Sequence, residues 1–296
     1  MRLRSLILAA IFTIVFLLIC PFLLYKYAYS LEQNRAIILS YLVTNPTNEP
    51  IKNAHFYTYL PVKECGWQKV TRWEYPCRDA ALIDDDLGNT ILDCRLPLIP
   101  PYSTLPIDIR AWITLQEGPG KKNWLDPKDT RFIQPSHYVE SNATEIKALA
   151  QRLKTQSAYR TSKRIYNWVK NNIHFKDYIS KPLGALNALK LKTGDCTEGM
   201  ALFVALARAD GISSVGMAGY KITRNGKVAP LAYHNWAMFY AKERWRIADP
   251  KGATFDSQYN QYVATIIIGK RSAGRFPLGL YERFKVSNKA LRVIQL

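Results

Sequence analysis

Hydrophobic and polar residues follow three different patterns along the chain. Residues 5–24 form an apolar run without a charged side chain. From about Asn34 to Gln116, short segments rich in β-branched and aromatic residues alternate with turn sequences such as TNPTNEP and DDDLGN, which is typical of β-strands. Apolar residues then recur at helical spacing, and after Gly211 the period returns to two. The patterns predict an α+β protein: an N-terminal transmembrane helix, a small antiparallel β-sandwich, and a domain with helices packed on an antiparallel sheet.

Three helices are expected in the C-terminal half. The first begins at a capping box formed by Asn142 and Glu145. The second lies in IYNWVKNN, and the third starts near Cys196 in KTGDCTEGMALFVALARADG. Beyond them, the dipeptide Asn225-Gly226 predicts a hairpin turn between the strands SVGMAGYKIT and LAYHNWAMFY.

The apolar run at the N-terminus predicts a membrane anchor. Ser5–Leu24 is long enough to cross a bilayer as a helix and longer than an ordinary signal-peptide core. Arg2 and Arg4 precede it, so the positive-inside rule places the rest of the chain in the periplasm or exterior. The small residues of AYS, at 28–30, leave cleavage as an alternative, but we favour an uncleaved single-pass anchor in the cell (inner) membrane.

The chain is strongly basic. It has 41 Lys and Arg against 23 Asp and Glu, a formal net charge of +18. A generally basic exported protein accounts for this, and an anionic cell-surface polymer is a possible partner besides a protein or peptide substrate. No basic run with interleaved aromatic residues indicates nucleic-acid binding. Neither a cofactor nor a metal is expected. The acidic run Asp84–Asp86 lacks the Glu that a calcium loop needs, because Arg95 stands there, so we interpret the run as a turn.

Four cysteines follow the apolar run, and an exported domain allows disulfides. Cys65 and Cys77 flank the irregular segment GWQKVTRWEYP, and we predict that they pair. Cys94 is in phase with neighbouring leucines and is expected to face the core. Cys196 would then remain a free thiol in an oxidising compartment, which calls for an explanation.

Cys196 stands at the first turn of its predicted helix. There the helix dipole and unpaired N–H groups favour a thiolate, and the backbone can stabilise a developing oxyanion. His234 lies in the middle of a predicted strand, and Asp249 ends the following strand before Pro250. An imidazole oriented by a carboxylate could serve the thiol as a base. The alternative is a half-buried histidine that only bonds to a neighbour, and the spacing alone does not decide between them.

The loop between these two strands sets how His234 and Asp249 meet. If residues 241–242 form a two-residue loop, His234 lies directly opposite Asp249. A four-residue loop places Asp249 opposite Trp236, diagonal to His234 and still on the same face. A three-residue loop without a bulge would put the two side chains on opposite faces. The even loops therefore permit the pair.

These segments resemble the transglutaminase-like superfamily. TGDCTEGMALFVALARADGI, YHNWAMFY and WRIADP are similar to its Gly-x-Cys helix start, its His-x-Trp strand and its strand ending in Asp-Pro. IYNWVKNNIHF resembles the helix that precedes the cysteine in bacterial members. The resemblance covers roughly residues 140–255. It implies a papain-like triad with Cys196 as the nucleophile, His234 as the base and Asp249 as the orienting acid.

The apolar run, a Gly-, Pro- and charge-rich segment after residue 116 and the resemblance together divide the chain. Residues 1–30 would be the anchor, 31–118 an immunoglobulin-like sandwich of the kind that precedes many such domains, 119–140 a linker, and 141–296 the transglutaminase-like domain. Two departures from the family pattern stand out. Ser213, Ser214 and Val215 replace a Pro-Ala-Arg that many bacterial members carry, and Phe175 stands where many have Tyr. A second oxyanion donor is therefore not assured at Phe175.

The implied function is that of a membrane-anchored, exported thiol enzyme acting on amide bonds of glutamine side chains or peptides. An acyl-thioester would form on Cys196 and be resolved by water or by an amine, as in a cysteine acyltransferase or an amide hydrolase or protease. The alternative is a catalytically idle module of the same fold that binds peptide or cell-wall polymer.

Overall fold

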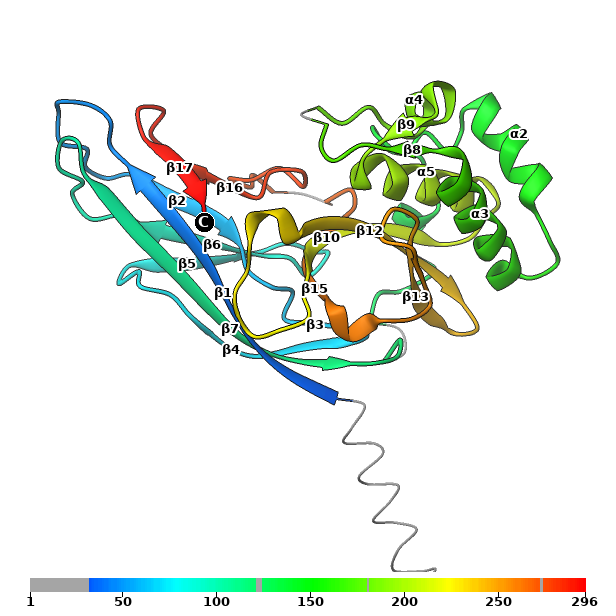
Figure 1. The fold of residues 1–296 in the computed structure, drawn as a ribbon, viewed down its shortest axis with the longest axis horizontal. Helices are drawn as coiled ribbons and strands as arrows, with labels where there is room; N and C mark the ends of the chain where they lie inside the picture. The colour runs from blue at the N-terminus through cyan, green and yellow to red at the C-terminus, as the bar shows by residue number, and fades with distance from the viewer. Residues whose placement is uncertain (1–31, 121–123, 180, 272–273) are drawn as a thin grey trace, which may run out of the picture.

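The computed structural model describes residues 32–120, 124–179, 181–271 and 274–296. Strands come first along the chain, helices follow, and strands return towards the C-terminus (Figure 1). The predicted anchor, Ser5–Leu24, lies outside the described residues. Within them, no helix combines the length and the apolar character needed to cross a membrane.

The first sheet is built on two long strands. The strand β1 pairs antiparallel with β7 along its whole length, from Glu32 opposite Gln116 to Thr44 opposite Thr104. Buried residues alternate along β7 from Ile107 to Leu115, the pattern of a strand with one face in a core. In spatial order the strands are β11 (Gly226–Lys227), β1 (Glu32–Thr44), β7 (Thr104–Gln116), β4 (Gln68–Glu74) and β3 (Glu64–Cys65), with β17 (Arg292–Gln295) also paired to β1.

The second sheet packs against the first. Its strands in spatial order are β16 (Phe284–Val286), β2 (His55–Tyr59), β6 (Thr90–Arg95) and β5 (Ala80–Asp84). Phe56 of β2 and Ile109 of β7 belong to the same buried cluster, so the two sheets share a core. Antiparallel sheets are thus confirmed for this part of the chain, whereas the immunoglobulin-like topology stays a prediction.

The third sheet forms a middle layer between helices and the first two sheets. Its strands in spatial order are β14 (Thr254–Phe255), β13 (Arg244–Asp249), β12 (Tyr233–Ala241), β10 (Ser214–Lys221) and β15 (Tyr262–Ile268). Ala237 and Phe239 of β12 are buried in a cluster that contains the helices. The alternate residues, Trp236 and Met238, join the core of the sandwich. Both faces of β12 are therefore covered, which explains its nearly continuous apolar sequence.

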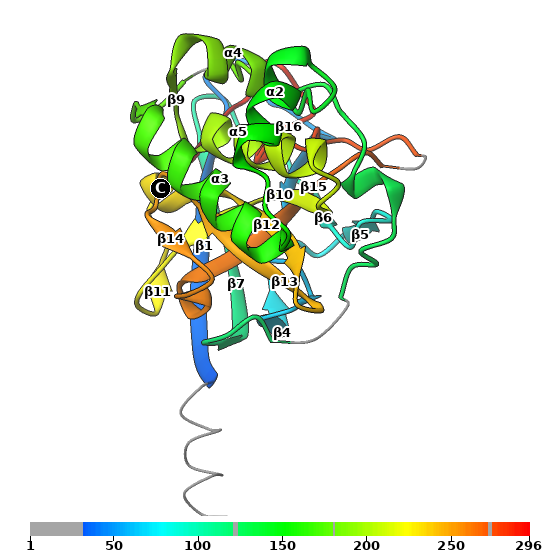
Figure 2. The same cartoon turned by 90° about the vertical axis from the view of Figure 1, so that its right-hand side faces the viewer.

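The helices cover one side of this middle sheet (Figure 2). They are α2 (Thr144–Leu153), α3 (Ala158–Asn172), α4 (Ala185–Leu191) and α5 (Cys196–Ala209). Short elements join them and the strands: β8 (His174–Phe175), β9 (Thr193–Gly194) and the 3₁₀ turns η1 (Thr130–Phe132), η2 (Pro230–Ala232) and η3 (Tyr259–Gln261). Ile146, Leu149 and Ala150 of α2 are buried, as their helical spacing predicts.

Side-chain amides connect β15 to the N-terminal strands. Gln68 binds both backbone groups of Ala264, donating to its carbonyl at 3.0 Å and accepting from its N–H at 2.8 Å. Asn89 does the same to Ile267, at 3.0 and 2.6 Å. Trp67 adds a bond from its indole N–H to the carbonyl of Tyr262, at 2.8 Å. These bonds satisfy backbone groups of β15, which is the edge strand of the middle sheet.

Strands from the second half of the chain pair with strands of the sandwich, across the predicted domain limits. The strands β16 and β17, near the C-terminus, pair with β2 and β1 of the sandwich, and β11 pairs with β1. Residues 124–140 of the segment predicted as a linker, 119–140, contact the rest of the fold: the carbonyl of Leu125 accepts from the indole of Trp245, and Phe132 is buried. The limits at 118 and 141 remain a prediction, but the described residues on both sides share one core.

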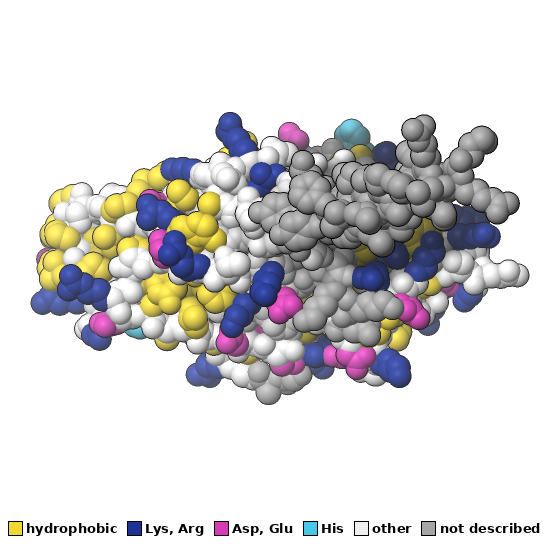
Figure 3. Space-filling model, turned by 90° about the horizontal axis from the view of Figure 1, so that it is seen from below, with side chains coloured by type: hydrophobic (Ala, Val, Ile, Leu, Met, Phe, Trp, Pro, Cys, Tyr) yellow, Lys and Arg dark blue, Asp and Glu magenta, His cyan; other side chains and the backbone are white. Residues whose placement is uncertain are grey.

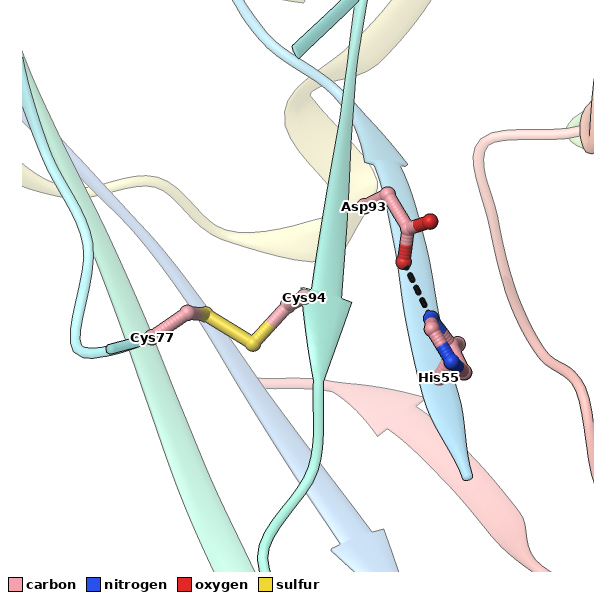
Figure 4. The surroundings of a disulfide bond; sticks show 4 residues. All are labelled: His55, Cys77, Asp93 and Cys94. Atoms are coloured by element: carbon pink, nitrogen blue, oxygen red, sulfur yellow. Dashed lines mark hydrogen bonds and ion pairs between the residues drawn. A yellow bond between two sulfur atoms is a disulfide. The ribbon is translucent and has the colours of Figure 1, made fainter. Parts of the chain in front are cut away.

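The predicted disulfide between Cys65 and Cys77 is wrong. Cys77 pairs instead with Cys94, and their Cα atoms are 5.5 Å apart (Figure 4). Strand pairing explains the difference, because Ala80 of β5 lies opposite Cys94 of β6 and so brings the preceding loop to it. Cys65 lies on β3 in the other sheet, buried with a free thiol. Cys196 is also free, as predicted.

Two local predictions also fail. The helix α2 begins after Ala143 with no side-chain cap, so Asn142 and Glu145 do not form a capping box, and Glu145 pairs with Lys190 instead. The strands β10 and β12 do pair antiparallel, but Asn225-Gly226 is not a tight turn between them. That loop extends to the first sheet, where Gly226 pairs with β1.

The acidic run forms a turn, as predicted from the sequence. Asp85 closes the turn between β5 and β6 by accepting from the N–H groups of Leu87 and Asn89, at 3.0 and 2.9 Å. On the face shown in Figure 3, Lys and Arg side chains are spread over the visible surface, with Asp and Glu among them.

Candidate active site

Cys196 is the first residue of α5, and a capping box fixes that helix start. The Asp195 carboxylate accepts from the N–H of Thr197 at 2.7 Å, and the Glu198 carboxylate accepts from the N–H of Asp195 at 2.9 Å. The N–H of Cys196 is among the first four of the helix, which have no carbonyl partner within it. Cys196 is partly exposed, so the helix presents the thiol beside a backbone donor that has no partner within the helix.

His234 and Asp249 form a hydrogen-bonded pair. Their Nε2 and Oδ2 atoms are 2.6 Å apart, and the side chains are 13% and 1% exposed. Because Nε2 faces the carboxylate, Nδ1 is the ring nitrogen left for another partner. A direct hydrogen bond thus joins two of the three site residues that the sequence predicted. The third, Cys196, interacts with the same imidazole.

The register of β12 and β13 shows how the loop between them places Asp249 relative to His234. Tyr240 lies opposite Trp245, the register predicted for a four-residue loop. The turn itself is shorter, because Ala241 also pairs with Arg244. Lys242 and Glu243 make the turn with positive φ angles of 51° and 58°, the backbone of a type I′ hairpin. Asp249 follows the last pair and so meets His234 diagonally.

Two further groups hold the Asp249 carboxylate. The hydroxyl of Tyr262 donates to Oδ2 at 2.7 Å, and the N–H of Gly252 donates to Oδ1 at 2.7 Å. A Cβ atom on Gly252 would lie 1.9 Å from Oδ2, so no larger residue fits without moving the carboxylate. Asp249 therefore keeps one orientation relative to the imidazole.

The pair shifts the proton affinity of both members. Burial alone would lower the pKa of His234, but hydrogen bonds and charges from Asp249 and Cys196 raise this pKa to about 9. Burial alone would raise the pKa of Asp249, but the bonds from His234, Gly252 and Tyr262 outweigh it and lower that pKa. The imidazole is therefore held in its protonated form at neutral pH, beside a carboxylate that remains ionised.

The sequence of this region matches a known family. Residues 147–250 fit the family model of the transglutaminase-like superfamily. This part of the chain is a transglutaminase-like domain. The match includes Cys196, His234 and Asp249 and ends one residue later, at Pro250.

One solved structure shares the fold over more of the chain than this domain. A protein from Cytophaga hutchinsonii, provisionally described as a cysteine protease, superposes with a TM-score of 0.58 at 17% identity, covering 90% of this chain and 92% of that one. The periplasmic domain of TgpA from Pseudomonas aeruginosa gives a TM-score of 0.37 at 16% identity, covering 72% of this chain and 87% of that one. No curated protein sequence matches the chain. At such identities the first likeness shows a shared fold.

A cleft of about 330 Å³ opens beside the thiol of the transglutaminase-like domain. Among the residues that line it are Cys196, Tyr233, Asn235 and Arg283. Leu231 also lines it and is 98% exposed, which is unusual for a leucine. The cleft thus gives a substrate access to Cys196 past an apolar side chain at the rim.

Asn235 is the least satisfied polar group of this cleft. The residue is 4% exposed, and its Oδ1 atom is buried without a hydrogen-bond partner among the described residues. It neighbours His234 on β12 but points to the other face, towards the helices. Phe175, the position raised by the family comparison, packs against the helical core and offers no donor. Asn235 follows His234 directly in the sequence, and its side-chain amide lines the cleft.

Sequence reasoning missed five residues that support this site, besides Asn235. The Asp195–Glu198 capping box was legible in the spacing D-x-x-E at the start of the helix. Tyr262, Gly252 and Arg283 gave no such signal, because strand pairing and chain reversals bring them to the site. Of the other histidines, His55 pairs with Asp93 in the sandwich, far from the thiol in the fold.

Proposed function

We propose that the protein is a thiol enzyme that cleaves amide bonds through an acyl-thioester on Cys196. One observation carries the proposal: a largely buried imidazole, 13% exposed and held by a carboxylate at 2.6 Å, interacts with a thiol at the N-terminus of a helix. This combination supplies a nucleophile, a proton carrier and an orienting acid in one place.

The first half-reaction uses the thiolate and the imidazolium. The sulfur of Cys196 attacks the carbonyl carbon, and the carbon–nitrogen bond breaks as His234 gives its proton to the leaving nitrogen. The products of this step are the acyl-thioester and free ammonia or an amine. Asp249 stays ionised and keeps the ring oriented, as its bonds to Tyr262 and Gly252 favour.

The second half-reaction regenerates the thiol. Neutral His234 removes a proton from water or an amine, which attacks the thioester carbon and releases the sulfur. Water gives hydrolysis and an amine gives transfer. The partly open cleft admits either acceptor, so both outcomes belong to the proposal, with glutamine side chains or peptides as acyl donors.

Stabilisation of the tetrahedral intermediate is assigned to two donors. The backbone N–H of Cys196 is one, since it lies at the start of α5. The side-chain amide of Asn235 is the other, since it lines the cleft together with Cys196. Its NH₂ group can then face the developing oxyanion.

We further propose that the enzyme is anchored in the cell membrane by Ser5–Leu24, with the described residues outside the cytoplasm. Arg2 and Arg4 ahead of the apolar run support this orientation. The disulfide between Cys77 and Cys94 supports an oxidising compartment. A reporter fused after Leu296 should be active outside the cytoplasm, and activity only in the cytoplasm would contradict the orientation.

The proposed chemistry is tested by trapping the thioester. The full chain is incubated with a panel of glutamine-containing and cell-wall peptides, and intact mass and peptide mapping locate any acyl adduct. We expect an adduct on Cys196 that is lost in Cys196→Ala, with thermal stability nearly unchanged because the thiol is partly exposed. Turnover that persists in Cys196→Ala would overturn the proposal. Peptide binding without any adduct would favour the idle binding module instead.

A further inference from the structure

Arg283 is a cation that the sandwich contributes to the active-site cleft. It directly precedes β16, which pairs with β2. Its carbonyl accepts from the N–H of Tyr59 at 3.5 Å and from the hydroxyl of Thr58 at 3.2 Å. Among the described residues that line the cleft, Arg283 is the one Lys or Arg. Its backbone position is thus fixed by the sandwich while its side chain lies in the cleft with Cys196.

The guanidinium of Arg283 lacks a carboxylate partner within the described part of the chain. It lies over the ring of Tyr233, 4.7 Å from the ring centre. One nitrogen donates to the side-chain oxygen of Gln295 at 3.4 Å. No Asp or Glu of the described residues comes within ion-pair distance of it. A guanidinium has five N–H donors, and the bond to Gln295 uses one of them, so the group can also bind an acceptor from outside the chain.

The two carboxylates that line the cleft, Asp177 and Asp195, do not form an ion pair with Arg283. Both oxygens of Asp195 are engaged by backbone donors, the N–H groups of Thr197 and Ile179. Asp177 is exposed at the rim. A planar guanidinium pairs best with a carboxylate, through two parallel hydrogen bonds. The acceptor that suits Arg283 is therefore a carboxylate brought by the substrate.

We infer that Arg283 binds a carboxylate of the acyl donor, so that the preferred substrates are peptides with a free acidic group close to the amide that Cys196 attacks. The inference rests on the proposed function for the identity of the attacked bond. The acidic group is either a C-terminal carboxylate or an acidic side chain, and Tyr233 provides the aromatic face beneath the guanidinium. Arg283 is then a specificity residue supplied from outside the transglutaminase-like segment.

The charge preference of the cleft is measured with matched alkylating probes. Iodoacetyl-glycine is compared with iodoacetyl-glycinamide, and a second pair carries one more glycine to vary the reach. A third pair, iodoacetyl-aspartate amide and iodoacetyl-asparagine amide, places the acid on a side chain. Alkylation rates at Cys196 are followed on the full chain by intact mass and peptide mapping. The readout is the ratio of the acidic to the neutral rate.

In Arg283→Gln, this ratio should fall roughly tenfold for the pair whose reach matches the site, while the neutral rate stays unchanged. Arg283→Lys should keep part of the preference. Arg292→Gln is the matched control, because it removes an exposed arginine from the same sandwich and should leave the ratio as in the wild type. An unchanged ratio for every pair in Arg283→Gln would overturn the inference.

A second measurement needs no variant. Alkylation of the wild-type thiol by iodoacetyl-glycinamide is repeated with N-acetyl-glycine, N-acetyl-aspartate amide or N-acetyl-glycinamide added. At least one of the two acids should protect Cys196 and the neutral amide should not; equal effects of all three would count against Arg283. Any accessible thiol gives these rates whether or not it cleaves amides. Failure of the inference is therefore distinct from failure of the proposed function, which shows as the absence of an acyl adduct.

Discussion

Two histidine–aspartate pairs of the same length occur in different parts of the molecule. His234–Asp249 in the middle sheet and His55–Asp93 in the sandwich are both 2.6 Å long. The first is 13% and 1% exposed, and the second 34% and 20%. A cysteine neighbours each pair, but Cys94 follows Asp93 on β6 and is closed in a disulfide (Figure 4).

The contrast separates what a short bond shows from what a site requires. In the sandwich, adjacent strand residues point to opposite faces, so Asp93 and Cys94 cannot act on one ligand. In the middle sheet, the imidazole lies beside a free thiol, in a cleft, with its carboxylate fixed by two further donors. Burial and a reactive partner distinguish the candidate active site, and the hydrogen bond alone does not.

The most direct way to break this comparison is to neutralise each acid in turn. Asp249→Asn should keep the fold but orient the imidazole poorly, and we expect activity to fall by about 10⁴-fold, as for other triads. Asp93→Asn, the matched change in the exposed pair, should leave activity within about twofold. Steady-state kinetics on a substrate found by thioester trapping checks both. Equal losses in the two variants would show that the exposed pair also serves the chemistry.

A smaller effect is expected from the proposed oxyanion donor. Asn235→Ala removes the amide that lines the cleft, and we expect kcat to fall by about 10²–10³-fold with little change in KM. Alkylation of Cys196 by iodoacetamide involves no oxyanion, so its rate should stay near that of the wild type. A loss confined to KM would assign Asn235 to substrate binding rather than to the intermediate.

The smallest expected effect is a dependence of the free energy of unfolding on pH, which comes from the buried pair His234–Asp249. The pKa of His234 rises from 6.5 to about 9 in the folded state, so folding stabilises the protonated ring. That contribution, about 3 kcal/mol, is fully present below pH 6.5 and is lost as pH rises through 9. Urea unfolding at several pH values between these limits should show the decline. In His234→Gln the decline should be shallower; an identical slope would remove His234 as its cause.

Much of the site was predictable from the sequence because its signals are local. A thiol at a helix start, a histidine in a strand and an acid before Pro250 each stand out within a few residues. The turn at Lys242 and Glu243 was not predictable, since neither residue is typical of positive φ. A loop of two residues and a loop of four residues both place Asp249 on the same face as His234. The pair could therefore be predicted although the register could not.

The remaining features depend on contacts between distant parts of the chain. The Cys77–Cys94 disulfide follows from the pairing of β5 with β6, which a view of the flanking segment alone does not give. Arg283 reaches the cleft because β16 pairs with β2, and the sequence around it carries no motif. The sequence predicted individual strands of the sandwich, whereas the structure was needed to show which strands pair with one another.

The position of β17 has a consequence for the order in which the chain is made. The strand β1 has β7 on one edge, but its other edge pairs with Gly226–Lys227 and with Arg292–Gln295. During synthesis from the N-terminus, part of this edge stays open until residues 292–295 have emerged. An open edge can bind other strands, so the nascent chain is exposed to misassembly throughout. A chain released before Arg292 is made would have all three triad residues and an unfinished first sheet.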